Sequence, residues 1–265
     1  MSDWLLNLPV PWMALVVFVA TYLTAGSIYL VVTRLAVNGR AKAFKAVSPG
    51  MLPPLGILFA LLVGFIAVEV WSNFDKAKAA VATEASALRA VVLLAGTFPE
   101  EQKTRIYALI NRHIDEAVNK EWPSMAHQRA SLSTLPTALV EELHDTLTLK
   151  AADDSQRAAQ PEIVKALHTA LDARRQRIVI SESTVGAVKW VGILLQGLCT
   201  LVAIAMVHSD NRLTCAITLT LFATGIALSV LLIAAYSRPF TGETSVRPEL
   251  LRQVIAGGAT VGTSR

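Results

Sequence analysis

The chain has 265 residues, of which 53% are hydrophobic and 17% charged, and its formal net charge is +4. An intrinsically disordered chain is excluded, because such chains are poor in apolar residues and rich in charge. Two cysteines are too few for a small secreted module held together by disulfides. The basic excess is small for this length, so its meaning depends on where the charges lie.

Four long apolar stretches predict a membrane protein with four spans. Each is about as long as the ~20 residues that a helix needs to cross ~30 Å of hydrocarbon. A helix of this length in a soluble core normally keeps a charged or polar face, whereas these stretches contain no charged residue. They cover residues 10–33, 52–68, 190–207 and 213–237.

The charged residues gather between the second and third spans and at the membrane flanks. Residues 73–185 are almost neutral, with 14 Lys/Arg and 15 Asp/Glu, so the basic surplus lies near the spans. This distribution and the absence of a known motif argue against a nucleic-acid partner. The short loop after the first span is basic, with Arg34, Arg40, Lys42 and Lys45, but more basic residues flank the other side. We therefore expect the middle section and both termini on the cytoplasmic side of the membrane.

The section between spans two and three is predicted to be helical. The second span should continue past Trp71 as one helix to about residue 95, followed by helices at 99–120, 135–149 and 161–182, with a break at Glu121-Trp122-Pro123. No strand-like alternation occurs, so the predicted fold class is an all-α membrane protein with four transmembrane helices and a helical extramembrane section. The expected divisions are residues 1–72 (spans one and two), 73–186 (extramembrane), 187–237 (spans three and four) and 238–265 (C-terminal tail).

No pattern in the sequence is typical of an enzyme. The five histidines show no ligand spacing, and P-loop, dinucleotide-binding and nucleophile-elbow motifs are absent. We therefore predict no catalytic residue, no metal site and no cofactor. The acidic pairs Asp153-Asp154 and Glu141-Glu142 are interpreted as a solvated turn and as helix surface, respectively.

Small residues recur every fourth position in the second span, at Gly56, Ala60 and Gly64. Such a stripe lets a neighbouring helix approach closely. The neighbour could be another span of the same chain or the same helix of a second copy, and periodicity alone leaves both open.

A parallel apolar row lies one residue further along, at Ile57, Leu61 and Phe65, and Glu69 and Asn73 continue its line with polar groups. Copies of this helix around one axis would form a hydrophobic constriction, which can gate ions by dewetting, with a polar mouth beyond it. Alternatively, the row faces lipid, and Glu69 is solvated at the interface or paired with a nearby lysine.

Several short motifs lie near the span ends and in the middle section. They are Pro54-Leu55-Gly56 and Gly64-Phe65 in span two, Trp71 at its end, Glu121-Trp122-Pro123, and Pro239-Phe240-Thr241-Gly242-Glu243 after the last span. With these motifs, nearly the whole chain resembles the bestrophin-like family of bacterial and plant membrane proteins, and more distantly the bestrophins.

The resemblance implies a channel. Bestrophins are pentameric anion channels with four spans per subunit, a cytosolic middle part and a neck lined by the second span. Their neck contains a Gly-Phe pair that Gly64-Phe65 matches, which implies neck positions at Phe65, Leu61 and Ile57. The acidic calcium clasp that follows the last span in bestrophins is missing here, since only Glu243 and Glu249 follow, so calcium gating is not implied.

Together with this resemblance, these observations favour a subunit of a homo-oligomeric ion channel of the bacterial inner membrane, a pentamer by analogy, that conducts ions passively. Its partners would be the lipid bilayer, further copies of the chain and the permeant ions, by analogy anions. The main alternative is a non-conducting, membrane-anchored interaction or scaffold protein whose helical section docks a partner. A membrane enzyme is a third, more distant alternative.

Overall fold

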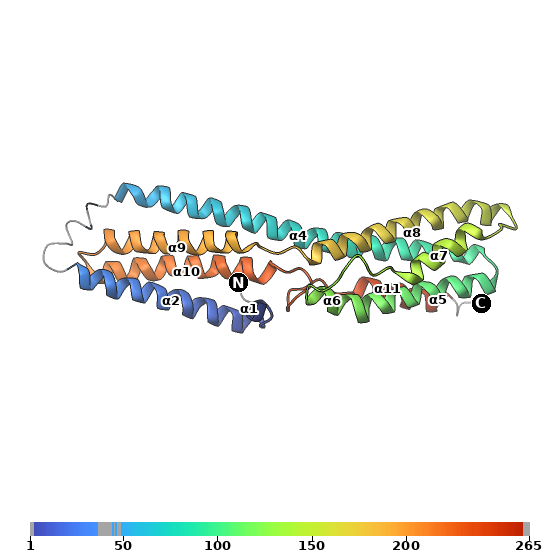
Figure 1. Cartoon of the computed structure of the whole chain (residues 1–265), viewed down its shortest axis with the longest axis horizontal. Helices are drawn as coiled ribbons and strands as arrows, with labels where there is room; N and C mark the ends of the chain where they lie inside the picture. The colour runs from blue at the N-terminus through green and yellow to red at the C-terminus, as the bar shows by residue number, and fades with distance from the viewer. Residues whose placement is uncertain (1–2, 37–43, 45, 47–48, 262–265) are drawn as a thin grey trace. The chain divides into compact units, whose positions relative to one another are not determined.

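A computed structural model describes residues 3–36, 44, 46 and 49–261, and the regular elements among them are all helices. The prediction of an all-α membrane protein is confirmed. Of the basic loop after the first span, Arg40, Lys42 and Lys45 lie outside the described residues. Four helices among the described residues are long and apolar enough to cross a membrane (Figure 1): α2 (Val10–Leu35), α4 (Leu52–Leu94, continued by the 3-10 turn η2, Ala95–Thr97), α9 (Ala187–Val207) and α10 (Arg212–Tyr236).

The chain divides into two compact units. The first, which we call the membrane unit, comprises residues 1–72, 184–238 and 242–244. In it, α2, α9 and α10 pack against one another and α1 (Asp3–Leu6) precedes them. Since lipid is as apolar as the side chains, close van der Waals packing holds such helices together. Gly197 of α9 is an example of this close packing, because a Cβ there would lie 3.5 Å from Ile226 of α10 and 3.6 Å from Phe59 of α4.

The second unit comprises residues 73–183, 239–241 and 245–265. Its centre is an apolar core that includes Leu88, Ile110, Ile163, Leu167 and Leu251, all buried. Burying side chains of this size stabilises a fold by about 1.5–3 kcal/mol each. Besides the second part of α4, its helices are α5 (Glu100–Glu116), the π-helical turn η3 (Ala117–Glu121), α6 (Trp122–Ala126), α7 (Thr137–Thr148), α8 (Asp154–Ser181) and α11 (Glu249–Val261).

The predicted break at Glu121-Trp122-Pro123 is wrong. The chain passes from α5 through the wider π-turn η3 directly into α6, and Pro123 lies in the first turn of that helix. Proline has no N–H to donate, and the π-turn before it locally changes the hydrogen-bond register. The helical path therefore continues to Ala126.

Two more boundaries differ from the prediction. Helix α8 begins at Asp154 rather than at Pro161, which lies inside it. The start is fixed by Asp153, whose Oδ1 accepts a hydrogen bond from the Gln156 N–H at 2.8 Å, so the interpretation of this pair as a solvated turn is replaced by a helix N-cap. In the C-terminal residues, α11 was not predicted, although Leu251 and Val254 on its buried face lie three residues apart.

Candidate functional site

The apolar row of the second span lies on a face of α4 that the membrane unit leaves uncovered. Ile57, Leu61 and Phe65 are 60%, 50% and 72% exposed. The opposite face, with Ile66 and Val70, is buried against the other spans. We call the uncovered side the outer face of α4.

The small residues lie beside this row and have free space around them. Ala60 and Gly64 are exposed, Gly56 is half-buried, and a Cβ added to either glycine would meet no atom within 4 Å. In contrast, the glycines Gly192 and Gly197 of α9 are already in contact with α4 side chains. Within the described residues of one chain, the stripe therefore has no helix packed closely against it.

Glu69, at the end of the apolar row, is paired rather than free. The Nζ of Lys189 lies 2.5 Å and 2.6 Å from the two Glu69 carboxylate oxygens, and both side chains are 43% exposed. A pair this exposed adds little to stability, but it balances the charge of the acid. Asn73, one turn further along α4, is half-buried.

The family motifs Glu121-Trp122-Pro123 and Pro239-Phe240 meet in the second unit. The rings of Trp122 and Phe240 pack edge to face, with centroids 5.7 Å apart and an interplanar angle of 87°. The Trp122 indole N–H donates to the Val246 carbonyl at 3.1 Å, and the Val246 N–H donates to the Pro239 carbonyl at 2.7 Å. These residues thus fix the chain that follows the last span.

The other motif residues lie in the membrane unit, except Thr241, which belongs to the second unit. Trp71 is 47% exposed. Gly242 has a φ of +82°, a left-handed conformation that favours glycine. The Glu243 Oε2 accepts a hydrogen bond from the Val10 N–H, at the start of α2, at 3.4 Å.

A buried group of charged side chains, which we call the ion cluster, lies beside Trp122. Arg177 of α8 is fully buried and donates to both oxygens of Glu84 on α4, at 2.8 and 3.1 Å, and to Glu121 at 2.8 Å. The guanidinium also lies 4.8 Å from the centroid of the Trp122 ring. His113 of α5 contacts Glu84 Oε1 at 3.0 Å. Burial alone would raise the pKa of Glu84, but Arg177 and His113 outweigh it and lower that pKa below its ordinary value.

The burial of these charged residues was not predicted, although the sequence contains a signal for it. The buried positions of α8 include a stripe of residues spaced three or four apart, namely Ile163, Leu167, Ala170, Arg174 and Arg177. Two arginines that continue an apolar stripe at helical spacing point into the core, and such arginines need buried acids as partners.

Comparison with known proteins gives a family and a fold for this chain. The family model of the Bestrophin-like domain matches residues 19–251. The chain belongs to the bestrophin-like family. This membership confirms the resemblance predicted from the motifs and supports a channel-like role for the protein.

Solved structures share the fold of this bestrophin-like chain at low sequence identity. Two crystal structures of point mutants of a bacterial bestrophin homologue from Klebsiella pneumoniae each have a TM-score of 0.65, at 13% and 14% identity. They cover 96% and 94% of this chain, which in turn covers 99% of each of them. A crystal structure of a membrane protein has a TM-score of 0.63 at 14% identity, and the match covers 90% of this chain and 97% of that one. No curated protein matches.

Proposed function

We propose that this chain is one subunit of a homo-oligomeric ion channel whose pore is lined by α4 of each copy, a pentamer by analogy with the bestrophins. The outer face of α4 carries the proposal. It presents an apolar row to its surroundings, and the small residues Gly56, Ala60 and Gly64 beside that row have open space. Small residues at helical spacing let helices of neighbouring copies approach closely.

In this proposal Ile57, Leu61 and Phe65 form three rings of a neck. A spacing of four residues separates the rings by about 6 Å along the helix, so the neck is about 12 Å long. Rings of apolar side chains in a narrow pore exclude water and thereby block ions until the pore widens. Glu69 and Asn73 would lie at the mouth beyond the neck.

The charge at this mouth does not favour cations, and the proposal of anions as permeant ions comes from the analogy with the bestrophins. An unpaired ring of Glu69 carboxylates would attract cations. Because Lys189 pairs with Glu69 in the same chain, the mouth carries no net negative charge from this acid. The proposed location is the bacterial inner membrane, with residues 73–186 and both termini in the cytoplasm.

Current through a planar bilayer that contains the purified protein tests the pore. We expect Phe65→Ala and Leu61→Ala to change the single-channel conductance or the open probability several-fold, because both widen the neck. Phe222→Ala in α10 and Leu23→Ala in α2 are matched controls, since these side chains are also exposed, at 49% and 67%, on other spans. The controls should conduct like the wild type.

The alternative, a non-conducting anchored interaction or scaffold protein, predicts that no current flows and that the neck variants behave like the controls. Absence of current under every ionic condition, or neck variants that behave like the controls, would contradict the pore. A monomeric mass in detergent would do so as well, because four spans of one chain leave little room for an axial pore.

Labelling from the periplasmic side tests the orientation. A membrane-impermeant maleimide should modify Asn38→Cys, in the loop after the first span, and should leave Lys150→Cys unmodified. The wild type serves as the control for Cys199 and Cys215. Modification of the cysteine at position 150 alone would reverse the proposed topology.

A further inference from the structure

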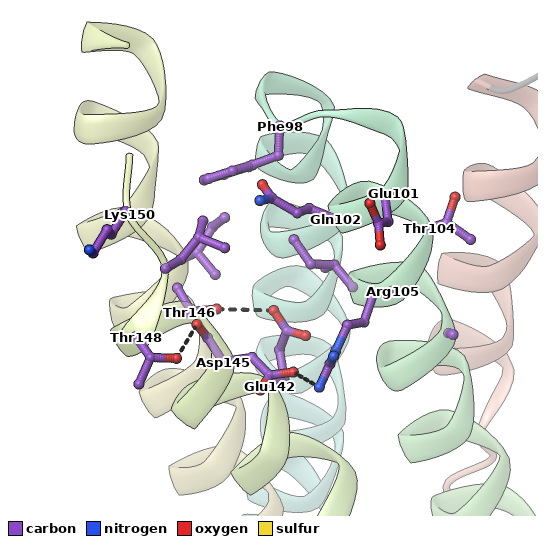
Figure 2. Close-up of a pocket in the computed structure, with 14 residues that line it drawn as sticks. Phe98, Glu101, Gln102, Thr104, Arg105, Glu142, Asp145, Thr146, Thr148 and Lys150 are labelled. Atoms are coloured by element: carbon purple, nitrogen blue, oxygen red, sulfur yellow. Dashed lines mark hydrogen bonds and ion pairs between the residues drawn. The ribbon is translucent and has the colours of Figure 1, made fainter. Parts of the chain in front are cut away.

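The second unit contains a cavity of about 690 Å³ between α5, α7 and α8. This volume is typical of sites for small organic molecules, which combine apolar walls with a few polar groups. Phe98, Ile106, Leu149 and Ile163 provide apolar surface, and Figure 2 shows the side chains of Glu142, Gln102 and Thr146 around the same space.

Two buried hydrogen-bond acceptors in this cavity have no partner. Glu142 is only 1% exposed; its Oε1 accepts from the Thr146 hydroxyl at 3.0 Å, whereas its Oε2 accepts no hydrogen bond. The Oε1 of Gln102 is buried and unpartnered as well. A buried polar atom without a partner destabilises the fold, and more so if it is charged, so a ligand that donates to these two atoms would bind favourably.

The placement of Glu142 corrects its interpretation as helix surface. Along α7 the buried residues are Ala138, Leu139, Glu142 and Thr146, a stripe at helical spacing. Glu142 therefore points inward with the apolar residues, while its neighbour Glu141 is exposed and pairs with Arg112. One turn of α7 thus carries one outward and one inward carboxylate.

The basic side chains around the cavity do not neutralise Glu142. Arg105 is 2.6 Å from Asp145 Oδ2 and 4.0 Å from Glu141. Lys150 and Glu101 also line the cavity, and both are exposed. Among the described residues, no ion pair joins either basic side chain to Glu142. A donor from outside the chain would complete this set of hydrogen bonds.

A metal ion fits this site poorly. Calcium takes six to eight oxygen ligands and magnesium six, and the cavity offers two free buried oxygens. Within residues 3–36, 44, 46 and 49–261, no group of His, Cys, Asp and Glu side chains could hold a metal ion. A ligand that donates N–H groups and brings an apolar body suits both the acceptors and the walls.

We propose that this cavity binds a small organic cation, a primary ammonium ion on a short apolar or aromatic body. The nitrogen donates to Glu142 Oε2 and to Gln102 Oε1, and the body packs against Phe98 and Leu149. The ligand makes a charge-assisted hydrogen bond to the carboxylate, which is about twice as strong as a neutral one. This site does not depend on the proposed pore.

The affinity should depend on pH. Burial, together with the nearby Asp145 and Glu141, raises the pKa of Glu142 to about 7, against the opposing effects of the Thr146 hydrogen bond and Arg105. Only the ionised carboxylate attracts an ammonium ion. Between pH 8 and pH 6 the ionised fraction falls about tenfold, and the affinity should fall by the same factor, while an aliphatic amine stays protonated.

Isothermal titration of the full chain in detergent with 2-phenylethylammonium chloride tests the site, and the uncharged 2-phenylethanol is the matched probe. We expect saturable binding of one amine per chain. The alcohol should bind at least about tenfold more weakly, because it cannot make the charge-assisted hydrogen bond to the carboxylate. Glu142→Gln, which keeps the side-chain shape, should weaken the amine by the same factor. Glu141→Gln is the matched control and should bind like the wild type.

Three results would overturn the proposal. Equal binding of the amine and the alcohol by the wild type would show an apolar cavity without ion recognition, and this comparison needs no variant to fold. Unchanged amine binding by a Glu142→Gln protein would place the ligand elsewhere. Calcium chloride that binds to the wild type and not to Glu142→Gln would make this a metal site instead. None of these readouts involves current, so they are independent of the pore.

Discussion

Two glutamates of the second unit are equally buried and behave in opposite ways. Glu84 on α4 is 0% exposed and Glu142 on α7 is 1% exposed. The pKa of Glu84 is lowered, whereas that of Glu142 is raised to about 7. Burial acts on both in the same direction, so the partners decide the difference.

The two surroundings indicate two different roles. Both oxygens of Glu84 accept hydrogen bonds from Arg177, and His113 adds a further contact, so the charge is fully compensated inside the chain. Glu142 accepts one hydrogen bond, from the Thr146 hydroxyl, and its Oε2, beside the cavity, accepts none. A closed set of partners is typical of a structural element, and an open set is typical of a site that a ligand completes.

The largest effect should follow from removing Arg177, the arginine partner of Glu84. Arg177→Met removes the arginine partner of the buried Glu84, which keeps its contact with His113, and one of the two arginine partners of Glu121. The loss of the partner of a buried charge costs about 3–5 kcal/mol. The melting temperature of the full chain in detergent should fall by about 10 °C. Arg175→Met is the matched control, because Arg175 is exposed on the same helix and pairs only with the exposed Asp172 in the described residues. Its melting temperature should stay within about 1–2 °C of the wild type.

A double variant separates the lost charge balance from lost packing. Adding Glu84→Leu to Arg177→Met removes an uncompensated charge and should recover part of the lost stability. If Arg177→Met melts like Arg175→Met, the ion cluster is not the structural element described above, and the comparison with Glu142 fails.

The sequence was sufficient for the parts of the fold in which one physical signal dominates. Four apolar stretches without charge predicted four spans, and α2, α4, α9 and α10 confirm them. The prediction that the second span continues as one helix to about residue 95 agrees with the end of α4 at Leu94. In these regions hydrophobicity and length decide the structure, and no distant partner is needed.

The sequence was insufficient where a local rule has exceptions and where the outcome depends on a partner far along the chain. Pro123 and Pro161 are helix breakers by local rule, yet Pro123 follows a π-turn in the first turn of α6 and Pro161 lies inside α8. Glu142 and Arg177 have the residue types of a surface, and only their spacing along apolar stripes shows that they point inward. The lining of a pore by Ile57, Leu61 and Phe65 stays a prediction, because it depends on other copies of the chain.

Replacing Glu142 by a side chain that cannot ionise should stabilise the protein, and by more at high pH. The folded-state pKa of Glu142 is about 7, above its ordinary value of 4.5. The stability that the neutral form contributes is therefore fully present below about pH 4.5 and is lost as the pH rises through 7. At pH 8 this loss amounts to about 3 kcal/mol at most. Glu142→Gln cannot ionise, so it should melt several degrees above the wild type at pH 8 and close to it at pH 4.5.

Melting curves of both proteins at pH 4.5, 6 and 8 check this prediction. The difference between variant and wild type cancels the titration of all other groups. A difference that stays constant over this range would mean that Glu142 does not change its protonation there, and the contrast with Glu84 would disappear.

A smaller effect should follow from weakening the aromatic side of the ion cluster. Trp122→Phe keeps the packing against Phe240 in part, but it removes the indole donor to the Val246 carbonyl and weakens the contact with Arg177. We expect a loss of about 1–2 kcal/mol, less than for Arg177→Met because both acids keep their arginine. A loss as large as that of Arg177→Met would mean that the tryptophan, rather than the charge balance, holds the cluster together.

The smallest effect is expected one residue before Glu142. Glu141 is exposed and pairs with Arg112, and such pairs contribute about 0–1 kcal/mol. Glu141→Gln should therefore change the melting temperature by no more than about 1–2 °C, and equally at pH 4.5 and pH 8. A pH-dependent gain like that of Glu142→Gln would show that general charge repulsion along α7, and not burial beside the cavity, governs both carboxylates. Two glutamates of one helical turn thus test whether the direction of a side chain, rather than its chemistry, decides its role here.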